Sequence, residues 1–203
     1  SLLLSNEDAV KLVQHPTIKA VGFTGSRNAG MKLFNAAVNR PDPIPVYAEM
    51  SAVNPVILME NALIRQKQKI ARDLSASVTL GAGQFCTNPG LVILVESEAS
   101  KNFLAEFAEH ISAAVPGSML NKSIYEAYTS GVAALQRIPG VAVLSNNILA
   151  SEVLRQARPV VHLVKGADFL RNKKFSEEVF GPATLVVSCA DDAELLRVIV
   201  SLE

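Results

Sequence analysis

The sequence predicts an α/β fold in which a mostly parallel sheet is flanked by helices. Short apolar strand patterns alternate with longer helical patterns along nearly the whole chain, and such alternation is typical of a parallel sheet covered on both faces. The 203 residues are enough for one domain with a substantial core, or for one domain and part of another. Hydrophobic residues make up 49% of the chain and charged residues 19%, which is a globular composition.

The first half of the chain alternates between strands and helices up to a cysteine-containing turn. Its strands are predicted from apolar runs, and its helices from apolar residues that recur at helical spacing. Prolines at 41, 43 and 45 cannot continue a helix and therefore separate the first helix from the next strand. The predicted elements are strands at 19–25, 46–50 and 56–60 and helices at 27–39 and 63–80.

The second half continues the same alternation. A strand follows the cysteine-containing turn directly, and Pro139-Gly140 closes a helix whose start is less sharply marked. An amphipathic helical pattern lies near the end of the chain. The predicted elements are strands at 91–95, 141–144, 160–164 and 183–187 and helices at 99–115, 125–136 and 191–200.

Composition excludes several classes of protein. Lysine plus arginine equals aspartate plus glutamate at 19 each, and no basic stripe is interleaved with aromatics, so a nucleic-acid partner is not expected. No apolar run approaches the roughly 20 residues that a membrane span needs. The two cysteines lack the spacing of metal ligands and nothing implies secretion, so neither a metal site nor a disulfide is expected. The protein is therefore predicted to be cytoplasmic, with both cysteines reduced. Because the chain starts at Ser1 rather than methionine, we expect a piece of a longer polypeptide.

The turn that contains Cys86 has the most chemical character. Residues 81–90 read Gly-Ala-Gly-Gln-Phe-Cys-Thr-Asn-Pro-Gly and join a predicted helix to the strand at 91–95. Glycines allow a ligand to approach the backbone, and turns at the ends of strands often carry chemistry. The local sequence leaves two interpretations open, a nucleophilic cysteine and a buried thiol without a chemical role. Cys189 follows an apolar run and is predicted to be a core or strand-end thiol.

Three other segments each have a functional and a structural interpretation. The strand, glycine turn and helix start at 23–30 would suit a phosphate, but Ser26 could be no more than a helix N-cap. Glu49 lies between apolar neighbours where a strand ends, so partial burial would make it a usable general base; the alternative is a carboxylate that faces water. Residues 176–182, Ser-Glu-Glu-Val-Phe-Gly-Pro, predict by themselves only a loop that enters a strand.

Taken together, these four segments resemble the aldehyde dehydrogenase superfamily, whose order and approximate spacing they follow across nearly the whole chain. Residues 43–50 and 83–90 are most similar to its α-ketoglutaric semialdehyde dehydrogenase branch, whose relatives include NADP-dependent fatty aldehyde dehydrogenases. The resemblance implies that residues 1–48 are the last piece of a Rossmann-like cofactor domain and that residues 49–203 belong to the catalytic domain. It also implies a small-molecule aldehyde substrate, NADP or NAD as cofactor, and a homo-oligomer when the protein is full length.

The resemblance assigns roles to individual positions. Cys86 matches the nucleophile and Glu49 the general base of the family. The other matches are Gly25 and Ser26 near the cofactor pyrophosphate, Met50 beside the nicotinamide, Glu178 at the nicotinamide ribose, Phe180 next to it, and Phe85 and Thr87 in the aldehyde channel. In this mechanism the Cys86 thiolate attacks the aldehyde and forms a thiohemiacetal, whose oxyanion could accept a hydrogen bond from the Cys86 N–H. Loss of a hydride to the nicotinamide leaves a thioester. Glu49 then activates the water that hydrolyses the thioester.

The chain also departs from the family pattern. Met50-Ser51-Ala52 replaces the usual Leu-Gly-Gly after the general base, and the added side chains should stiffen that turn. Most of the cofactor fold, its lysine at the adenosine ribose and the asparagine oxyanion donor are absent, so residues 1–203 alone are predicted to be inactive. An acylating, coenzyme A-dependent enzyme and a non-catalytic module are the alternatives. Glu49 argues against the first, and the intact pair of Cys86 and Glu49 argues against the second.

The three histidines are given no role in this chemistry. His15 precedes a proline and is predicted to lie in a turn, and His110 falls on the polar face of a predicted helix. His162 lies within a strand pattern and is predicted to be a core or edge residue.

Overall fold

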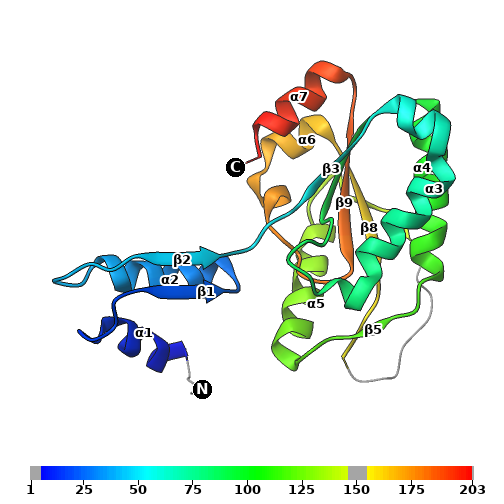
Figure 1. The fold of residues 1–203 in the computed structure, drawn as a ribbon. Helices are drawn as coiled ribbons and strands as arrows, with labels where there is room; N and C mark the ends of the chain where they lie inside the picture. Colours follow the sequence, from blue (N-terminus) through cyan, green and yellow to red (C-terminus); the bar gives the residue numbers. More distant parts are fainter. Residues whose placement is uncertain (1–5, 146–154, 203) are drawn as a thin grey trace. The chain divides into compact units, whose positions relative to one another are not determined.

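A computed structural model describes residues 6–145 and 155–202 and has the predicted α/β fold (Figure 1). The chain divides into two compact units, Ser1–Ser51 and Ala52–Glu203. They are called the first and second unit below.

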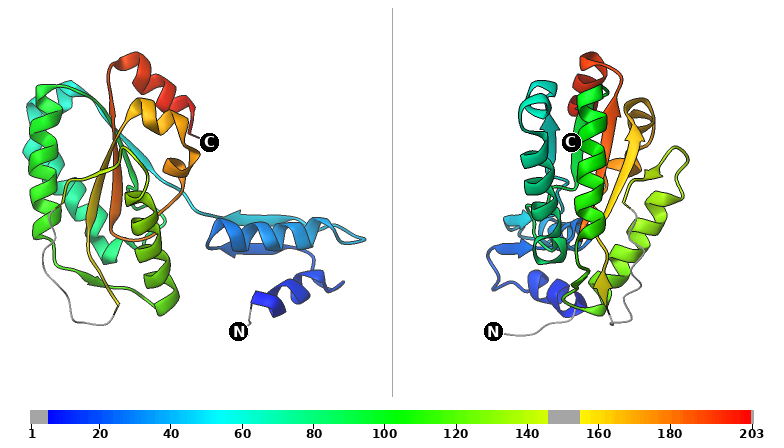
Figure 2. Two further views of the ribbon diagram at one scale, coloured as in Figure 1. Left: turned by 180° about the vertical axis from the view of Figure 1, so that it is seen from behind. Right: turned by 90° about the vertical axis from the view of Figure 1, so that its right-hand side faces the viewer.

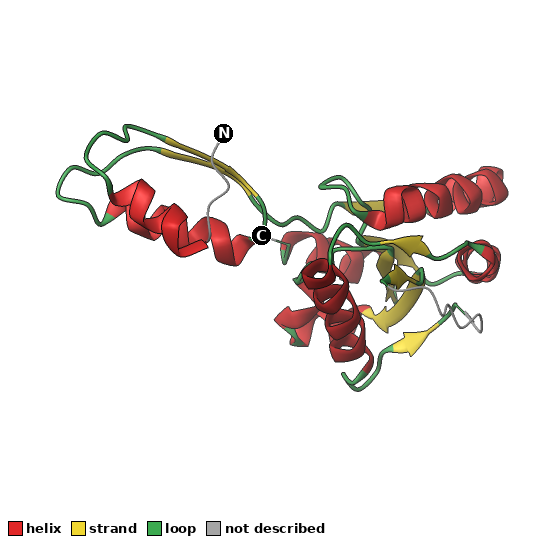
Figure 3. Ribbon diagram, turned by 90° about the horizontal axis from the view of Figure 1, so that it is seen from below, coloured by secondary structure: helices red, strands yellow, loops and turns green. Residues whose placement is uncertain are grey.

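The first unit is a pair of parallel strands with helices packed against them (Figure 3). β1 pairs with β2 in register from Val21 opposite Val46 to Thr24 opposite Glu49, so both strands end at the same edge. Helix α2 connects the two strands, as in any parallel pair that needs a crossover. The elements are α1 (Asn6–Gln14), β1 (Val21–Thr24), α2 (Arg27–Val38) and β2 (Val46–Glu49).

A small core and one buried arginine hold the first unit together. Val13, Ala37 and Ile44 are its buried apolar residues. Arg40 is only 9% exposed, and its guanidinium donates to the carbonyl of Val13 at 2.9 Å and to the carbonyl of Ile18 at 3.0 Å. Arg40 therefore fixes the end of α1 and the segment that follows it against the rest of the unit.

The second unit is a five-stranded sheet between helices. The strand order is β3-β4-β9-β8-β6, and every neighbouring pair is parallel except β6 with β8. β5 and β7 form a separate antiparallel pair. The elements are β3 (Pro55–Leu58), α3 (Glu60–Thr79), η1 (Leu80–Gly83), β4 (Leu91–Val95), α4 (Glu98–Ala113), β5 (Gly117–Ser118), α5 (Lys122–Gln136), β6 (Ala142–Val143), β7 (Gln156–Ala157), β8 (Val160–Lys165), α6 (Gly166–Arg171), η2 (Lys173–Ser176), β9 (Ala183–Cys189) and α7 (Asp192–Val200).

The helices bury both faces of this sheet. α3 and α4 cover one face, and α6 and α7 cover the other (Figure 2). Since successive strand residues point to opposite faces, Val92 of β4 joins Phe103 and Phe107 of α4, whereas Ile93 joins Phe169 of α6. All seven residues of the central strand β9 are buried. This two-sided burial explains why the strands are continuous apolar runs in the sequence.

The predicted elements are present, with ends that differ by a few residues. α3 begins at Glu60 and α5 at Lys122, each a little earlier than the apolar pattern indicated, because polar residues form their first turns. The short elements α1, η1, β5, β7, α6 and η2 were not predicted. A two-residue strand has no period to detect, and a helix of six residues contains fewer than two turns.

Candidate active site

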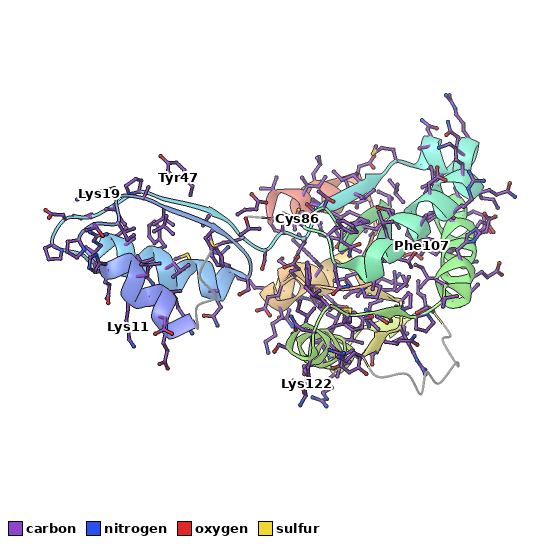
Figure 4. The ribbon with its side chains drawn as sticks, turned by 60° about the horizontal axis from the view of Figure 1, so that its bottom comes forward. Lys11, Lys19, Tyr47, Cys86, Phe107 and Lys122 are labelled. Carbon is purple, nitrogen blue, oxygen red and sulfur yellow. The ribbon has the colours of Figure 1, made fainter. Side chains whose placement is uncertain are left out.

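Cys86 is an exposed thiol on the loop between η1 and β4 (Figure 4). The buried-thiol interpretation of this residue is therefore wrong. Directly before this loop, three successive residues of η1 lie in the left-handed region, Gly81, Ala82 and Gly83, with φ of 55°, 57° and 65°. Only glycine adopts this region without strain, and such strain is concentrated at functional sites.

The start of the Cys86 loop packs tightly against the Gly181-Pro182 turn. A Cβ added at Gly83 would lie 2.3 Å from the carbonyl carbon of Gly181, so no side chain fits there. The Asn88 side-chain amide donates to the carbonyl of Gly181 at 3.0 Å. The loop that carries the thiol is thus fixed to the segment that contains Glu178 and Phe180. The two segments lie far apart in the sequence, since Asn88 and Gly181 are 93 positions apart.

Side-chain amides brace the rest of the loop. Asn54 donates through Nδ2 to the carbonyls of Cys86, at 2.7 Å, and Asn88, at 3.0 Å. Gln84 accepts from the N–H of Leu120 at 2.8 Å and donates to the carbonyl of Gly81 at 3.0 Å. Within the described residues, the N–H of Cys86 has no protein acceptor, so it remains able to donate to a bound group.

These segments meet at the amino edge of the sheet. Asn54 precedes β3, the Cys86 loop precedes β4, and the Gly181 turn precedes β9, and these three strands are parallel. Glu178 and Phe180 are half-buried and line a cavity of about 20 Å³ together with Asn88. Such a cavity holds roughly one water-sized group. This is the edge opposite to the one at which α/β proteins usually bind ligands.

The first unit places its predicted site residues at the carboxyl edge of its strands. Ser26 is the N-cap of α2, where its hydroxyl accepts from the N–H of Ala29 at 3.3 Å, so the N-cap interpretation is confirmed. The N–H of Gly25 donates to the carbonyl of Glu49 at 3.0 Å, while the Glu49 side chain is exposed. The partial burial of Glu49 that its apolar neighbours predicted is therefore not found within this unit. Glu49 ends β2 on the same face as the exposed Tyr47, so its side chain meets solvent.

The start of α2 offers a donor that suits a phosphate. The N–H of Asn28 has no acceptor among residues 6–145 and 155–202, and it lies at a helix N-terminus, where the dipole favours anions. The departure at residues 50–52 affects the same turn. The Ser51 hydroxyl accepts from the N–H of Arg27 at 3.3 Å, and the Met50 sulfur lies so close to Gly30 that an added Cβ would be 2.5 Å away.

The predicted site residues therefore fall into two groups. Gly25, Ser26, Glu49 and Met50 belong to the first unit, and Phe85, Cys86, Thr87, Glu178 and Phe180 belong to the second. Phe85 and Thr87 are exposed beside Cys86. The pairing of Cys86 with Glu49 joins residues of different units and stays a prediction.

The second cysteine provides an internal contrast. Cys189 is buried in β9, as predicted, and burial raises the pKa of its thiol to about 11, with a smaller contribution from the carboxylates of Glu194 and Asp191. Such a thiol is inert at neutral pH. Across the part of the chain that the structure describes, no group of His, Cys, Asp or Glu side chains could hold a metal ion, and no helix is long and apolar enough to cross a membrane.

The bracing amides are the candidate-site residues that sequence reasoning missed. Gln84 and Asn88 lie in the Cys86 turn and Asn54 closely follows Met50-Ser51-Ala52, but no role was assigned to them. A signal was present, since Asn54-Pro55 and Asn88-Pro89 are the same dipeptide and each lies where a strand starts, with Pro55 the first residue of β3 and Pro89 two residues before β4. Asn-Pro marks a turn.

Comparisons with known proteins place the chain among known sequences and folds. The family model described as "Aldehyde dehydrogenase family" matches residues 4–129. The chain is 41% identical over 198 residues to the α-ketoglutaric semialdehyde dehydrogenase of Acinetobacter baylyi, covering 97% of this chain and 38% of that protein. It is 44% identical to α-ketoglutaric semialdehyde dehydrogenase 2 of Azospirillum brasilense, covering 95% of this chain and 36% of that protein. The chain thus spans less than two-fifths of the length of these relatives.

Solved structures share the fold. The γ-glutamyl-γ-aminobutyraldehyde dehydrogenase of Burkholderia cenocepacia superimposes with a TM-score of 0.81 at 18% identity, over 98% of this chain and 41% of that one. A 1-pyrroline-5-carboxylate dehydrogenase gives a TM-score of 0.79 at 22% identity, over 98% of this chain and 39% of that one.

Proposed function

Because the chain belongs to the aldehyde dehydrogenase family, we propose that it supplies the nucleophile and the hydrolytic base for NAD(P)-dependent oxidation of an aldehyde to a carboxylic acid. The proposed substrate is α-ketoglutaric semialdehyde, on the strength of relatives at 41% and 44% identity that carry that name. The proposed active protein is a longer homo-oligomeric subunit, in which residues 1–48 belong to the cofactor domain and residues 49–203 to the catalytic domain.

The observation that carries the proposal is an exposed thiol on a braced loop with a free N–H beside it. The Cys86 thiolate attacks the aldehyde carbon, and the carbonyl π electrons move to oxygen to give a thiohemiacetal oxyanion. The N–H of Cys86 is available to donate to that oxyanion. A fixed donor stabilises the transition state because it needs no reorganisation when the charge develops.

The residues present fit a dinucleotide cofactor. The free N–H of Asn28 at the start of α2, next to Gly25 and Ser26, would bind a phosphate oxygen. Glu178 and Phe180 would hold the nicotinamide ribose, and Met50, which packs over the start of α2, would limit how closely the ring approaches. Bound NADP, or NAD, supplies the acceptor for the hydride that leaves the substrate carbon.

Release of the product needs a base. Once the substrate carbon has lost a hydride, it is a thioester on Cys86. Glu49 takes a proton from water as the water oxygen attacks the thioester carbon, the C–S bond breaks, and the carboxylic acid and the Cys86 thiolate are released. Residues 1–203 alone, without the remainder of a family-length subunit, are proposed to be inactive.

The test uses a family-length subunit that carries these residues, assayed with α-ketoglutaric semialdehyde and either NADP or NAD. Cys86→Ser should abolish oxidation, whereas Cys189→Ser is the matched control and should retain it. Glu49→Gln should release about one equivalent of reduced cofactor and then stop, because the thioester forms but is not hydrolysed. Full turnover by Cys86→Ser would refute the proposal. Product that appears only with coenzyme A would replace the hydrolytic route with the acylating one.

A further inference from the structure

We propose that Asn54 is a positioning residue for Cys86. Its side-chain amide holds two carbonyls of the thiol-bearing loop and so fixes the direction in which the thiol and the backbone N–H of Cys86 are presented. The catalytic part of this inference rests on the proposed function, whereas the structural part does not.

The hydrogen bonds lie at the point where orientation matters. Nδ2 of Asn54 is 2.7 Å from the carbonyl oxygen of Cys86 itself and 3.0 Å from that of Asn88, two residues on. An amide nitrogen carries two hydrogens, so this one group satisfies both carbonyls at once. The bridge closes the turn that contains Cys86 and Thr87 from outside, across 32 positions of sequence.

Asn54 is itself held firmly. It directly precedes β3, whose first residue Pro55 is paired with Leu91 at the start of β4. The segment before it also touches the end of the Cys86 loop, since a Cβ added at Gly90 would lie 3.2 Å from the carbonyl oxygen of Val53. The amide is therefore anchored to the paired strands, and the loop is held relative to the sheet.

The backbone at Asn54 restricts which residues can replace it. Its φ is 45°, in the left-handed region that asparagine and glycine tolerate best. Asn54→Gly keeps this conformation and removes only the amide. Asn54→Asp keeps the size of the side chain but places a carboxylate, which cannot donate, against two carbonyl oxygens. These two variants separate the hydrogen bonds from the backbone.

The first measurement needs no dehydrogenase activity. Amide hydrogen exchange is measured in this chain at Asn88 and Gly90, whose N–H groups donate within the loop to Phe85 and Asn88. Asn54→Gly and Asn54→Asp should each raise exchange at these amides by about tenfold. The matched control is Ser97→Gly, which removes the side-chain cap of α4 at the other end of β4 and should leave the loop amides unchanged. If the exchange rates of the Asn88 and Gly90 amides rise no more than in Ser97→Gly, the Asn54 hydrogen bonds do not hold the loop, and the proposal is overturned.

The second measurement uses the family-length subunit. Both Asn54 variants should lower kcat for aldehyde oxidation about 10- to 100-fold with KM for the aldehyde within about threefold, because misplacement of a reacting group affects the transition state more than binding. Ser97→Gly should leave kcat and KM unchanged. An unchanged kcat in an active enzyme would overturn the positioning role while leaving the proposed function intact. A wild-type subunit that oxidises no aldehyde would refute the proposed function instead. The hydrogen-exchange result would then decide by itself whether Asn54 holds the Cys86 loop.

Discussion

The two units place their candidate site residues at opposite edges of parallel strands. In the first unit, Gly25 directly follows β1, Glu49 ends β2, and Ser26 caps the start of a helix at that carboxyl edge. In the second unit, Asn54, Cys86 and Gly181 all precede their strands at the amino edge. The side chains that brace the two edges differ accordingly.

The difference lies in which backbone groups the side chains pair. A helix start leaves N–H groups without partners. At the carboxyl edge the hydroxyls of Ser26 and Ser51 accept from N–H groups of α2. At the amino edge the amides of Asn54 and Asn88 donate to carbonyls of the loops that precede β4 and β9. The first arrangement leaves N–H groups for an anion, and the second orders a loop that can carry a nucleophile.

Gly83→Ala should have the largest effect, because the amino edge depends on backbone contact. The new Cβ would lie 2.3 Å from the carbonyl of Gly181, at a residue whose φ is 65°. We expect the free energy of unfolding of the second unit to fall by about 4 kcal/mol, or the loop to be displaced. Urea denaturation, monitored through hydrogen exchange of amides in β4 and β9, measures the free energy of unfolding of the second unit.

The matched control is Gly22→Ala on β1, where nothing lies within 4 Å of the added Cβ. It should change the stability of the first unit by less than about 1 kcal/mol, in either direction. Equal losses from the two variants would contradict the view that backbone contact between Gly83 and Gly181 makes the amino edge intolerant of a side chain.

Mild acid should weaken the second unit selectively. His162 lies fully buried in β8, and burial lowers its pKa to about 4. The unfolded chain, with a histidine pKa near 6.5, binds the proton first, so this contribution to stability is present above about pH 6.5 and lost as the pH falls to about 4. We expect a loss on the order of 3 kcal/mol across this window in chemical denaturation of the second unit.

The control for the pH effect is His162→Leu, which should flatten the dependence between pH 6.5 and 4. Hydrogen bonds from Lys69 and Lys165 lower the pKa values of the Asp73 and Glu96 carboxyls, and His162→Leu leaves both of these pairs in place, so the difference between wild type and variant belongs to His162. The described residues of the first unit include no buried histidine, so hydrogen exchange in that unit should change little over the same pH range. An unaltered slope in His162→Leu would assign the effect to another group.

The parts of this structure that depend on local sequence were predictable. Apolar periods predicted the long helices and the buried strands, and the Ser26 cap joins atoms only three residues apart. The chemistry assigned to Cys86 and Glu49 came from resemblance of short motifs, because neither residue is distinctive alone. His162 and Cys189 are buried, as their strand patterns predicted, whereas the catalytic roles of Cys86 and Glu49 stay predictions.

The parts that depend on strand register were not predictable. The bond from Asn54 to the Cys86 carbonyl requires β3 to pair with β4 starting at Pro55 and Leu91, and an apolar run does not specify that register. The close approach of Gly83 to Gly181 requires β9 to lie beside β4. The antiparallel pairing of β6, only two residues long, likewise has no local signal.

The smallest expected effect concerns the carboxyl edge. Ser26→Ala removes the side-chain acceptor at the N-cap of α2 and should lower the stability of the first unit by about 1 kcal/mol, because the N–H of Ala29 loses its partner. Ser51→Ala removes a second acceptor, for Arg27, that lies outside the helix, and should lower it by about 0.5 kcal/mol or less. Hydrogen exchange at Arg27 and Ala29 distinguishes the two variants. If Ser51→Ala lowered the stability more than Ser26→Ala, the turn formed by Met50, Ser51 and Ala52 would be the main support of this edge. The larger loss would then be explained by the stiffening that the added side chains of this turn are predicted to give.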